Sequence, residues 1–149
     1  MKSENKILTQ TTVQLLQNGH PIEIKALGYS MFPLLRPNHR LVVEPIEPQN
    51  CKKGDIIVFI AYDRLIAHRL VEINSHQLIC RGDATLHRDE PITYKQLLGK
   101  VTARKNHNKT KHLTTLLQKW YGRLILFSHP LSALLFIKMI PIASKKLPS

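Results

Sequence analysis

The residues with the clearest potential for chemistry lie in the stretch Gly28–Pro33, which reads GYSMFP. We expect Gly28 to allow a tight turn in which other residues would be strained, and Pro33 to favour a fixed turn or the start of a short helix. A serine held at such a bend directs its hydroxyl group out of the backbone. Because this hydroxyl is a poor nucleophile at neutral pH, it needs a base within hydrogen-bond reach. Ser30 is therefore a candidate nucleophile, and an ordinary turn residue is the alternative.

Four further short motifs follow this turn along the chain. They are Gly54-Asp55, Ala67-His68-Arg69, Gly82-Asp83 with the later Asp89, and Gly99-Lys100-Val101. In this order the five motifs resemble the signal peptidase I family of serine proteases, most closely the branch with a histidine base that includes the archaeal and endoplasmic-reticulum enzymes. The resemblance covers about residues 27–101, roughly half of the chain. It implies a serine endopeptidase that cleaves signal or leader peptides after small residues.

The resemblance also implies the partners of Ser30. It places the general base at His68, where most bacterial signal peptidases carry a lysine, although a mid-strand histidine can also be a plain core residue. A histidine base needs an acceptor for its second ring nitrogen. Asp83 and Asp89 match acidic positions of the histidine branch, and we expect Asp89 to orient His68 and Asp83 to support the site. The alternatives are a Gly-Asp turn for Asp83 and solvated surface charge for Asp89.

Two further features of the site follow from the same resemblance. Many family members have a serine two residues before the nucleophile that adds a hydroxyl donor for the oxyanion, and here that position is Gly28. The Ser30 N–H remains as a donor. A shallow apolar groove is expected to accept small side chains, with core packing as the alternative and the favoured role for Phe32. Its expected lining is Ile24, Ala26, Met31 and Phe32.

Composition bounds the class of protein. The 149 residues are 43% hydrophobic, which suits one domain with a real core. Cys51 and Cys80 are too few for a disulfide framework and lie in no metal-binding spacing, so a reducing compartment is permitted. Asp55 reads as a structural turn residue. The sequence contains no metal-ligand spacing, phosphate loop or nucleotide motif, so no cofactor is predicted.

The net charge of +12 is concentrated near the C-terminus, where residues 101–149 hold nine Lys or Arg and no Asp or Glu. Such a segment suits an anionic membrane surface or a nucleic acid. The aromatic residues there lie at helical, apolar positions rather than between basic ones, so a membrane is favoured and no nucleic acid is expected. The N-terminus has no apolar run typical of a signal peptide or anchor, unlike most of the family. Peripheral membrane association is predicted, and a cytoplasmic location is compatible with it.

The apolar pattern predicts a mainly β fold, a small, mostly antiparallel β-barrel or folded sheet of the signal peptidase type. The expected strands are 21–27, 40–46, 56–60, 65–73, 77–81 and 97–104, with a helix over 4–18 and a loop over 82–91. Helical periodicity returns over 113–127 and 131–142, the second ended by Pro141. These helices either lie on a membrane or pack on the β domain or on a partner. The predicted organisation is a helix in 1–20, a peptidase domain in 21–105 and a basic, helical tail in 106–149.

Two other classes of protein compete with a signal peptidase. Self-cleaving repressors share the Ser-Met turn and a related β fold, but they need a DNA-binding domain and a lysine base. This chain has only 27 residues before the turn and a histidine at the base position. The second alternative is a non-enzymatic, membrane- or RNA-associated β module, which the basic tail motivates.

Overall fold

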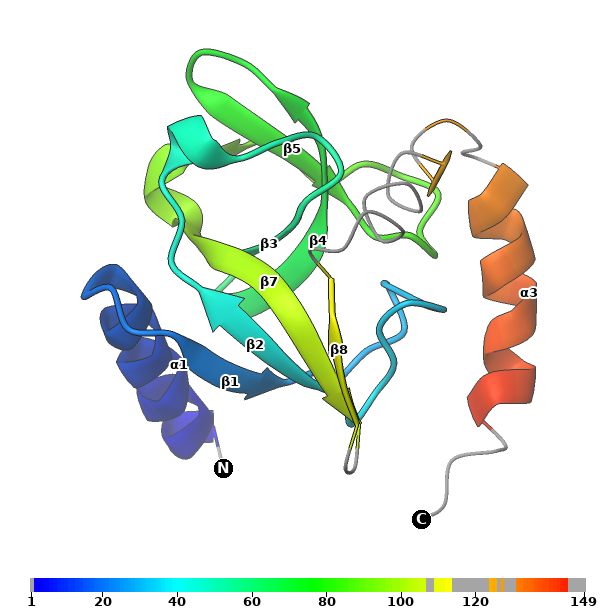
Figure 1. The fold of residues 1–149 in the computed structure, drawn as a ribbon, viewed down its shortest axis with the longest axis horizontal. Helices are drawn as coiled ribbons and strands as arrows, with labels where there is room; N and C mark the ends of the chain where they lie inside the picture. The colour runs from blue at the N-terminus through cyan, green and yellow to red at the C-terminus, as the bar shows by residue number, and fades with distance from the viewer. Residues whose placement is uncertain (1, 107–108, 114–123, 126, 128–130, 145–149) are drawn as a thin grey trace.

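The computed structural model describes residues 2–106, 109–113, 124–125, 127 and 131–144 (Figure 1). Apart from the helical residues 124, 125 and 127, these residues form eight strands and two helices. The helices are α1 (Lys2–Gln17) and α3 (Leu131–Ser144), and two 3₁₀ turns span Pro48–Asn50 and Tyr94–Gln96. The strands are β1 (Ile22–Lys25), β2 (Arg40–Glu44), β3 (Ile56–Ala61), β4 (Arg64–Ile73), β5 (Gln77–Arg81), β6 (Ile92–Thr93), β7 (Leu97–Asn106) and β8 (Lys109–His112).

All pairs between the described strands are antiparallel, and they belong to one sheet. Its order is β1-β2-β7-β3-β4-β5-β6, and β8 also pairs with β7. The prediction of a mainly β, antiparallel domain between two helical segments is therefore confirmed. The described strands form an open, folded sheet, because β1 and β6 end the order and do not pair with each other.

Alternation along the strands divides the apolar side chains between two cores. In β3, Ile56 and Val58 join one core, whereas Ile57 and Phe59 join the other. The first core includes Leu16 of α1, which is 2% exposed, so this helix covers one face of the sheet. Gly19, with φ of 84°, ends α1, and the N–H of His20 donates to Leu15 O at 2.9 Å, as in a Schellman motif.

The sequence predicted most strands but missed two. β6 has only two residues, and β8 reads KTKH with all four side chains exposed, so neither carries an apolar pattern. Because β8 spans Lys109–His112, the sheet extends into residues 106–149, which were predicted to form a helical tail. The helix predicted over 113–127 falls almost wholly outside the described residues. The helix predicted over 131–142 is observed as α3. This helix continues through Pro141 to Ser144, so the predicted end at Pro141 is wrong.

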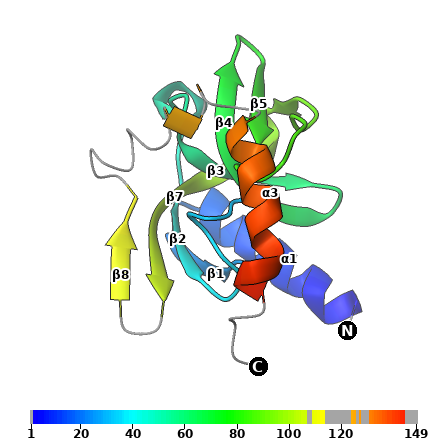
Figure 2. The ribbon, with the colours of Figure 1, turned by 90° about the vertical axis from the view of Figure 1, so that its right-hand side faces the viewer.

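Helix α3 packs against the segment that carries Ser30. Figure 2 shows α3 on the side of the sheet that faces the viewer. Ala133 is fully buried, and the Phe136 ring meets the Phe32 ring edge-on with centroids 6.4 Å apart. Most of the other side chains in residues 131–140 are exposed, among them Leu131 at 75% and Leu135 at 58%. Packing on the β domain, one of the two outcomes expected for this helix, is therefore observed for one face. None of the helices in the described part of the chain has the length and apolarity needed to cross a membrane.

Candidate active site

The turn that carries Ser30 is held at its backbone by a distant segment. The Ala84 N–H donates to Ser30 O at 2.8 Å, and the Phe32 N–H donates to Tyr29 O at 2.9 Å. Gly82 lies so close that a Cβ atom there would be 2.6 Å from Ser30 O and 3.1 Å from Ser30 Cβ. Gly82 and Ala84, which follow β5, therefore pack directly against the Ser30 backbone. The close approach at position 82 leaves no space for a side chain and so requires glycine.

Ser30, His68 and Asp89 form a continuous hydrogen-bonded chain. Ser30 Oγ lies 2.9 Å from His68 Nε2, and His68 Nδ1 lies 2.6 Å from Asp89 Oδ2. The side chains of His68 and Asp89 are 12% and 27% exposed and Ser30 is half-buried, so these three residues lie near the protein surface. A serine, a histidine and an aspartate in this order form the constellation that activates a serine hydroxyl for attack on a carbonyl group.

His68 is positioned by the β3–β4 hairpin. It lies opposite Ile57 in the antiparallel register, and its ring meets the Phe59 ring edge-on at 6.3 Å. The hairpin turn consists of Tyr62 and Asp63, both with positive φ, which is the geometry of a two-residue turn that matches strand twist. His68 is therefore held in the sheet by its pairing with β3, and β4 also pairs with β5 from Arg69 onward.

Asp89 reaches His68 from the loop between β5 and β6. The Asp89 N–H donates to Cys80 O at 2.8 Å, which ties this part of the loop back to β5. The neighbouring Arg88 pairs with Glu72 of β4 at 3.0 Å. Both contacts hold Asp89 near the face of β4 that carries His68.

Asp83 does not contact His68 but pairs with Arg69. Arg69 donates through Nε and Nη2 to the two carboxylate oxygens of Asp83, at 2.7 and 2.6 Å, and through Nη1 to Gly54 O at 2.7 Å. The side chains of Arg69 and Asp83 are 3% and 1% exposed. This buried pair links β4 to Gly82 and Ala84, the residues that contact the Ser30 backbone. Asp83 thus lies in a supporting position beside the hydrogen-bonded chain of Ser30, His68 and Asp89.

Arg69, Gly82 and Ala84 have roles at this site that the sequence did not predict. Arg69 follows His68, so strand alternation turns it toward the opposite, interior face. A buried arginine requires a carboxylate partner, which is the signal that could have linked it to an aspartate. Gly82 and Ala84 act through their backbone, and the sequence carries no signal for such contacts.

Two expectations about the turn are wrong. Gly28 does not have a left-handed backbone, and a Cβ atom there would meet nothing within 4 Å, so other residues fit without strain. Met31 is only 3% exposed and belongs to the first core, so it does not line a groove. Phe32 is 2% exposed, in agreement with the core-packing role favoured for it. Of the four residues expected to line the groove, only Ile24 and Ala26 are partly exposed.

The cysteines do not offer a competing nucleophile. Burial raises the pKa of the Cys51 thiol to about 11 and that of the Cys80 thiol to about 12. Both thiols therefore stay protonated at neutral pH, whereas nucleophilic attack by cysteine requires the thiolate. Asp55 has a structural position, since it pairs with Lys100 at 2.7 Å and accepts from the Lys52 N–H.

No group of three or more His, Cys, Asp or Glu side chains suited to a metal ion occurs within the described residues. Comparisons with protein-family models, with curated proteins and with solved structures give no significant match.

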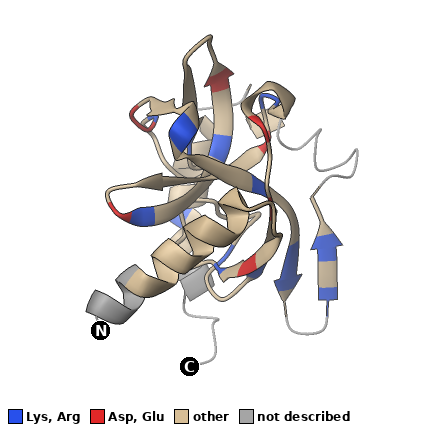
Figure 3. Ribbon diagram, turned by 90° about the vertical axis from the view of Figure 1, so that its left-hand side faces the viewer, with Lys and Arg blue, Asp and Glu red and all other residues tan. Residues whose placement is uncertain are grey.

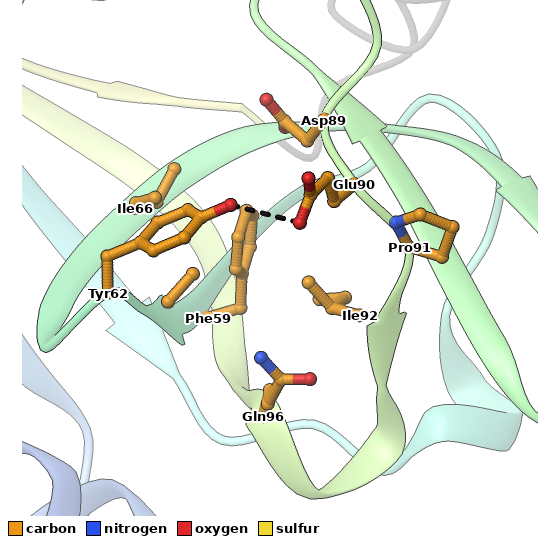
Figure 4. A pocket seen from close by; sticks show the side chains of 9 residues that line it. Phe59, Tyr62, Ile66, Asp89, Glu90, Pro91, Ile92 and Gln96 are labelled. Carbon is orange, nitrogen blue, oxygen red and sulfur yellow. Dashed lines mark hydrogen bonds between the residues drawn. The ribbon is translucent and has the colours of Figure 1, made fainter.

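A cavity of about 180 Å³ adjoins the site on the side of Asp89 (Figure 4). Its apolar walls come from β3, β4 and β6, and its polar residues come from the β3–β4 turn, the loop before β6 and the 3₁₀ turn after β6. The lining residues are Phe59, Ala61, Tyr62, Ile66, Asp89, Glu90, Pro91, Ile92 and Gln96.

Proposed function

We propose that this chain is a serine endopeptidase of the signal peptidase I type that cleaves signal or leader peptides after small residues. The observation that carries the proposal is the hydrogen-bonded chain from Ser30 Oγ through His68 to Asp89. The folded antiparallel sheet and the order of the five motifs support the finer assignment to the histidine-base branch.

In this mechanism Ser30 Oγ attacks the peptide carbonyl carbon while His68 Nε2 takes the hydroxyl proton. Asp89 accepts the hydrogen bond from His68 Nδ1–H, which fixes the ring orientation and stabilises the imidazolium that forms. His68 then donates the proton to the leaving amine, and an acyl-enzyme remains on Ser30. Water, deprotonated by His68, releases the acyl group and restores the serine.

Negative charge on the carbonyl oxygen needs donors that are already in place. The Ser30 N–H is the first candidate, because it has no hydrogen-bond partner within the described residues. Gly28 supplies no side-chain donor, so we expect slower turnover than in an enzyme with a serine at this position.

Strand β1 offers an edge on which an extended peptide can lie. Among the described strands β1 pairs only with β2, so its second edge has unpaired backbone groups, and the chain leads from it directly to Ser30. Peptide recognition by strand addition uses such an edge. The substrate backbone would thereby be aligned with the nucleophile.

The proposed setting is a membrane surface reached through the C-terminal helices. Exposed leucines of α3 and the Lys and Arg residues of β7 and β8 (Figure 3) support it, since apolar insertion and attraction to anionic lipid act together. Because α3 packs on Phe32, a membrane bound at α3 would lie close to the catalytic turn.

The test is mass-spectrometric detection of cleavage in a peptide library rich in small residues, with lipid vesicles present. Wild-type protein is compared with Ser30→Ala and His68→Ala. We expect cuts after alanine-like residues that fall at least about a thousandfold in either variant, as for loss of a member of a catalytic triad.

Ser75 provides a matched control, because it lies in the exposed turn between β4 and β5, away from the catalytic chain. Ser75→Ala should cleave as the wild type does, and circular dichroism should show all variants folded. Cleavage that persists in folded Ser30→Ala would contradict the proposal.

A further inference from the structure

The cavity beside Asp89 combines an apolar wall with acidic residues, and the proposed reaction at Ser30 does not involve this combination. Its walls are the apolar side chains of Phe59, Ile66 and Ile92, and its rim holds Asp89 and the carboxylate of Glu90 (Figure 4). An apolar channel with a carboxylate at its rim is complementary to an alkyl stem that ends in a positive charge, because such stems bury their methylenes and keep the charged group at a polar boundary.

Glu90 has a carboxylate oxygen to offer a cation. Its Oε2 accepts from the Tyr62 hydroxyl at 3.0 Å, and Oε1 has no partner within the described part of the chain. By contrast, four other described carboxylates already pair with Lys or Arg; these are Glu23, Asp55, Glu72 and Asp83.

Tyr62 adds a second feature suited to a cation. It lies at the tip of the β3–β4 hairpin, is 77% exposed and lines the cavity. The hydrogen bond and the charge of Glu90 raise the pKa of its phenol, so the hydroxyl stays protonated and keeps donating to the carboxylate. An aromatic ring beside a carboxylate attracts a cation through its π face as well as through charge.

The cavity is placed to receive a side chain of a peptide bound at Ser30. Asp89 belongs both to the cavity lining and to the catalytic chain. Ile66 lies two residues before His68 on β4 and so on the same face, about 7 Å away along the strand. A residue near the cleaved bond could therefore place its side chain in the cavity.

We propose that this cavity is a subsite for a lysine or arginine side chain of the peptide substrate, with Glu90 as the residue that selects the charge. The proposal rests on the peptidase function and names a feature of its substrate. A substrate with a small residue before the cleaved bond and a basic residue close to it is the predicted class.

The first measurement compares kcat/KM for peptides that carry lysine, norleucine or glutamate at each position flanking the cleaved bond. Norleucine keeps the alkyl stem and removes the charge. We expect a position at which lysine is preferred about tenfold over norleucine, and we expect Glu90→Gln to abolish that preference while cleavage of the norleucine peptide is retained. Glu90→Lys should favour glutamate there. Glu47→Gln, which changes an exposed carboxylate outside the cavity, should keep the lysine preference.

The second measurement does not depend on catalysis. Methyl NMR signals of Ile66 and Ile92 are followed while n-butylammonium is added to the wild type, and n-butanol is the neutral comparison. We expect larger shifts with the cation, and we expect that difference to disappear in Glu90→Gln.

Each negative outcome has a distinct meaning. Equal kcat/KM for lysine and norleucine at every position, or equal NMR shifts with both probes, would overturn the subsite. Absence of all cleavage together with a cation-specific NMR response would instead count against the peptidase function and leave the cation site standing.

Discussion

At the scale of single residues, the site depends on three side chains that come from three separate parts of the chain. Ser30 lies in a turn, His68 in the middle of β4 and Asp89 in a loop, yet two hydrogen bonds of 2.9 and 2.6 Å join them. With the ring proton on His68 Nδ1, that N–H donates to Asp89 and Nε2 accepts from the Ser30 hydroxyl, which is the arrangement that serine catalysis requires. The three side chains are thus already joined in the order that the proposed mechanism uses.

Gly28 leads to a prediction of increased activity. A Cβ atom at this position meets nothing within 4 Å, and the backbone does not require glycine. By the family resemblance, a serine hydroxyl here would donate to the oxyanion. We expect Gly28→Ser to raise kcat about tenfold, less than the effect of a fully preorganised donor because the position is exposed. The measurement is steady-state cleavage of one peptide.

Gly28→Ala is the matched control, since it adds the same Cβ atom without a hydroxyl group. It should leave kcat near the wild-type value. An equal rise in both variants would show that backbone restriction, rather than a new donor, explains the gain.

His39 leads to a prediction about pH and stability. It is 6% exposed, and burial, followed by the charges of Arg104 and Arg36, lowers its pKa from the ordinary value of 6.5. The unfolded chain therefore takes up this proton more readily than the folded protein. The stabilising contribution is complete above pH 6.5 and is lost as the pH falls from there through the folded-state pKa.

We expect the free energy of unfolding, measured in urea, to fall between pH 7.5 and pH 5.5. His39→Asn should reduce this fall, because it removes the titrating group and can still accept a hydrogen bond from the Arg36 N–H. His76→Asn, a change of an exposed histidine, should not. The same pH dependence in all three proteins would exclude His39 as its source.

The sequence alone could identify the candidate site of Ser30, His68 and Asp89 only in part. The sequence has eight histidines, and nothing in their spacing distinguishes His68; family resemblance singled it out. Asp89 lies 21 residues beyond His68, a separation that only the folded sheet and its loop bring to contact distance. The open space at Gly28 and the burial of Met31 depend on surrounding elements, so the sequence could not reveal them.

At the scale of elements, a buried ion pair joins the parts of the fold that carry the proposed catalytic residues. Arg69 on β4 is held by both oxygens of Asp83, which lies between Gly82 and Ala84, the two residues that clasp the Ser30 backbone. The strand that carries His68, the proposed general base, is thus coupled to the turn that carries Ser30, the proposed nucleophile. Strand patterns predicted β4 and β5, whereas this coupling arises from loop packing and could not be predicted from them.

Loss of this pair should destabilise the protein strongly. Asp83→Asn keeps the side-chain shape but leaves Arg69 charged in the interior, so we expect the free energy of unfolding to fall by about 3–5 kcal/mol. Urea denaturation followed by circular dichroism measures it. Glu72→Gln, which removes the exposed pair with Arg88, should cost under about 1 kcal/mol.

The same two variants distinguish a positioning role of Asp83 at the Ser30 turn from a contribution to the stability of the whole protein. In conditions where Asp83→Asn remains folded, its kcat should be reduced more than that of Glu72→Gln, because the Ser30 turn loses part of its anchor. A cost below about 1 kcal/mol for Asp83→Asn would show that the pair contributes little.

At the scale of the whole molecule, charge and apolar surface gather around the C-terminal part of the chain. The net charge is +12, with nine Lys or Arg and no acidic residue after position 100. Helix α3 keeps one face on the protein through Ala133 and Phe136 and exposes leucines on the other. Helical periodicity predicted this helix, but its docking onto Phe32 required the folded turn, which the apolar pattern alone does not contain.

This arrangement predicts binding to anionic vesicles. We expect co-sedimentation with vesicles of phosphatidylserine and phosphatidylcholine that weakens as salt rises, and much less with phosphatidylcholine alone. The double variant Leu131→Ser and Leu135→Ser should lower the binding constant at least about tenfold, because two exposed leucines lose their transfer into the lipid interface.

The control is a double variant on α1, Ile7→Ser and Leu8→Ser, whose side chains are 63% and 67% exposed. It removes comparable apolar surface from the other helix and should bind vesicles as the wild type does. If both double variants lost binding equally, exposed apolar surface in general, rather than α3, would govern the interaction. If neither did, charge alone would hold the protein at the vesicle, and the catalytic turn would have no fixed relation to the lipid surface.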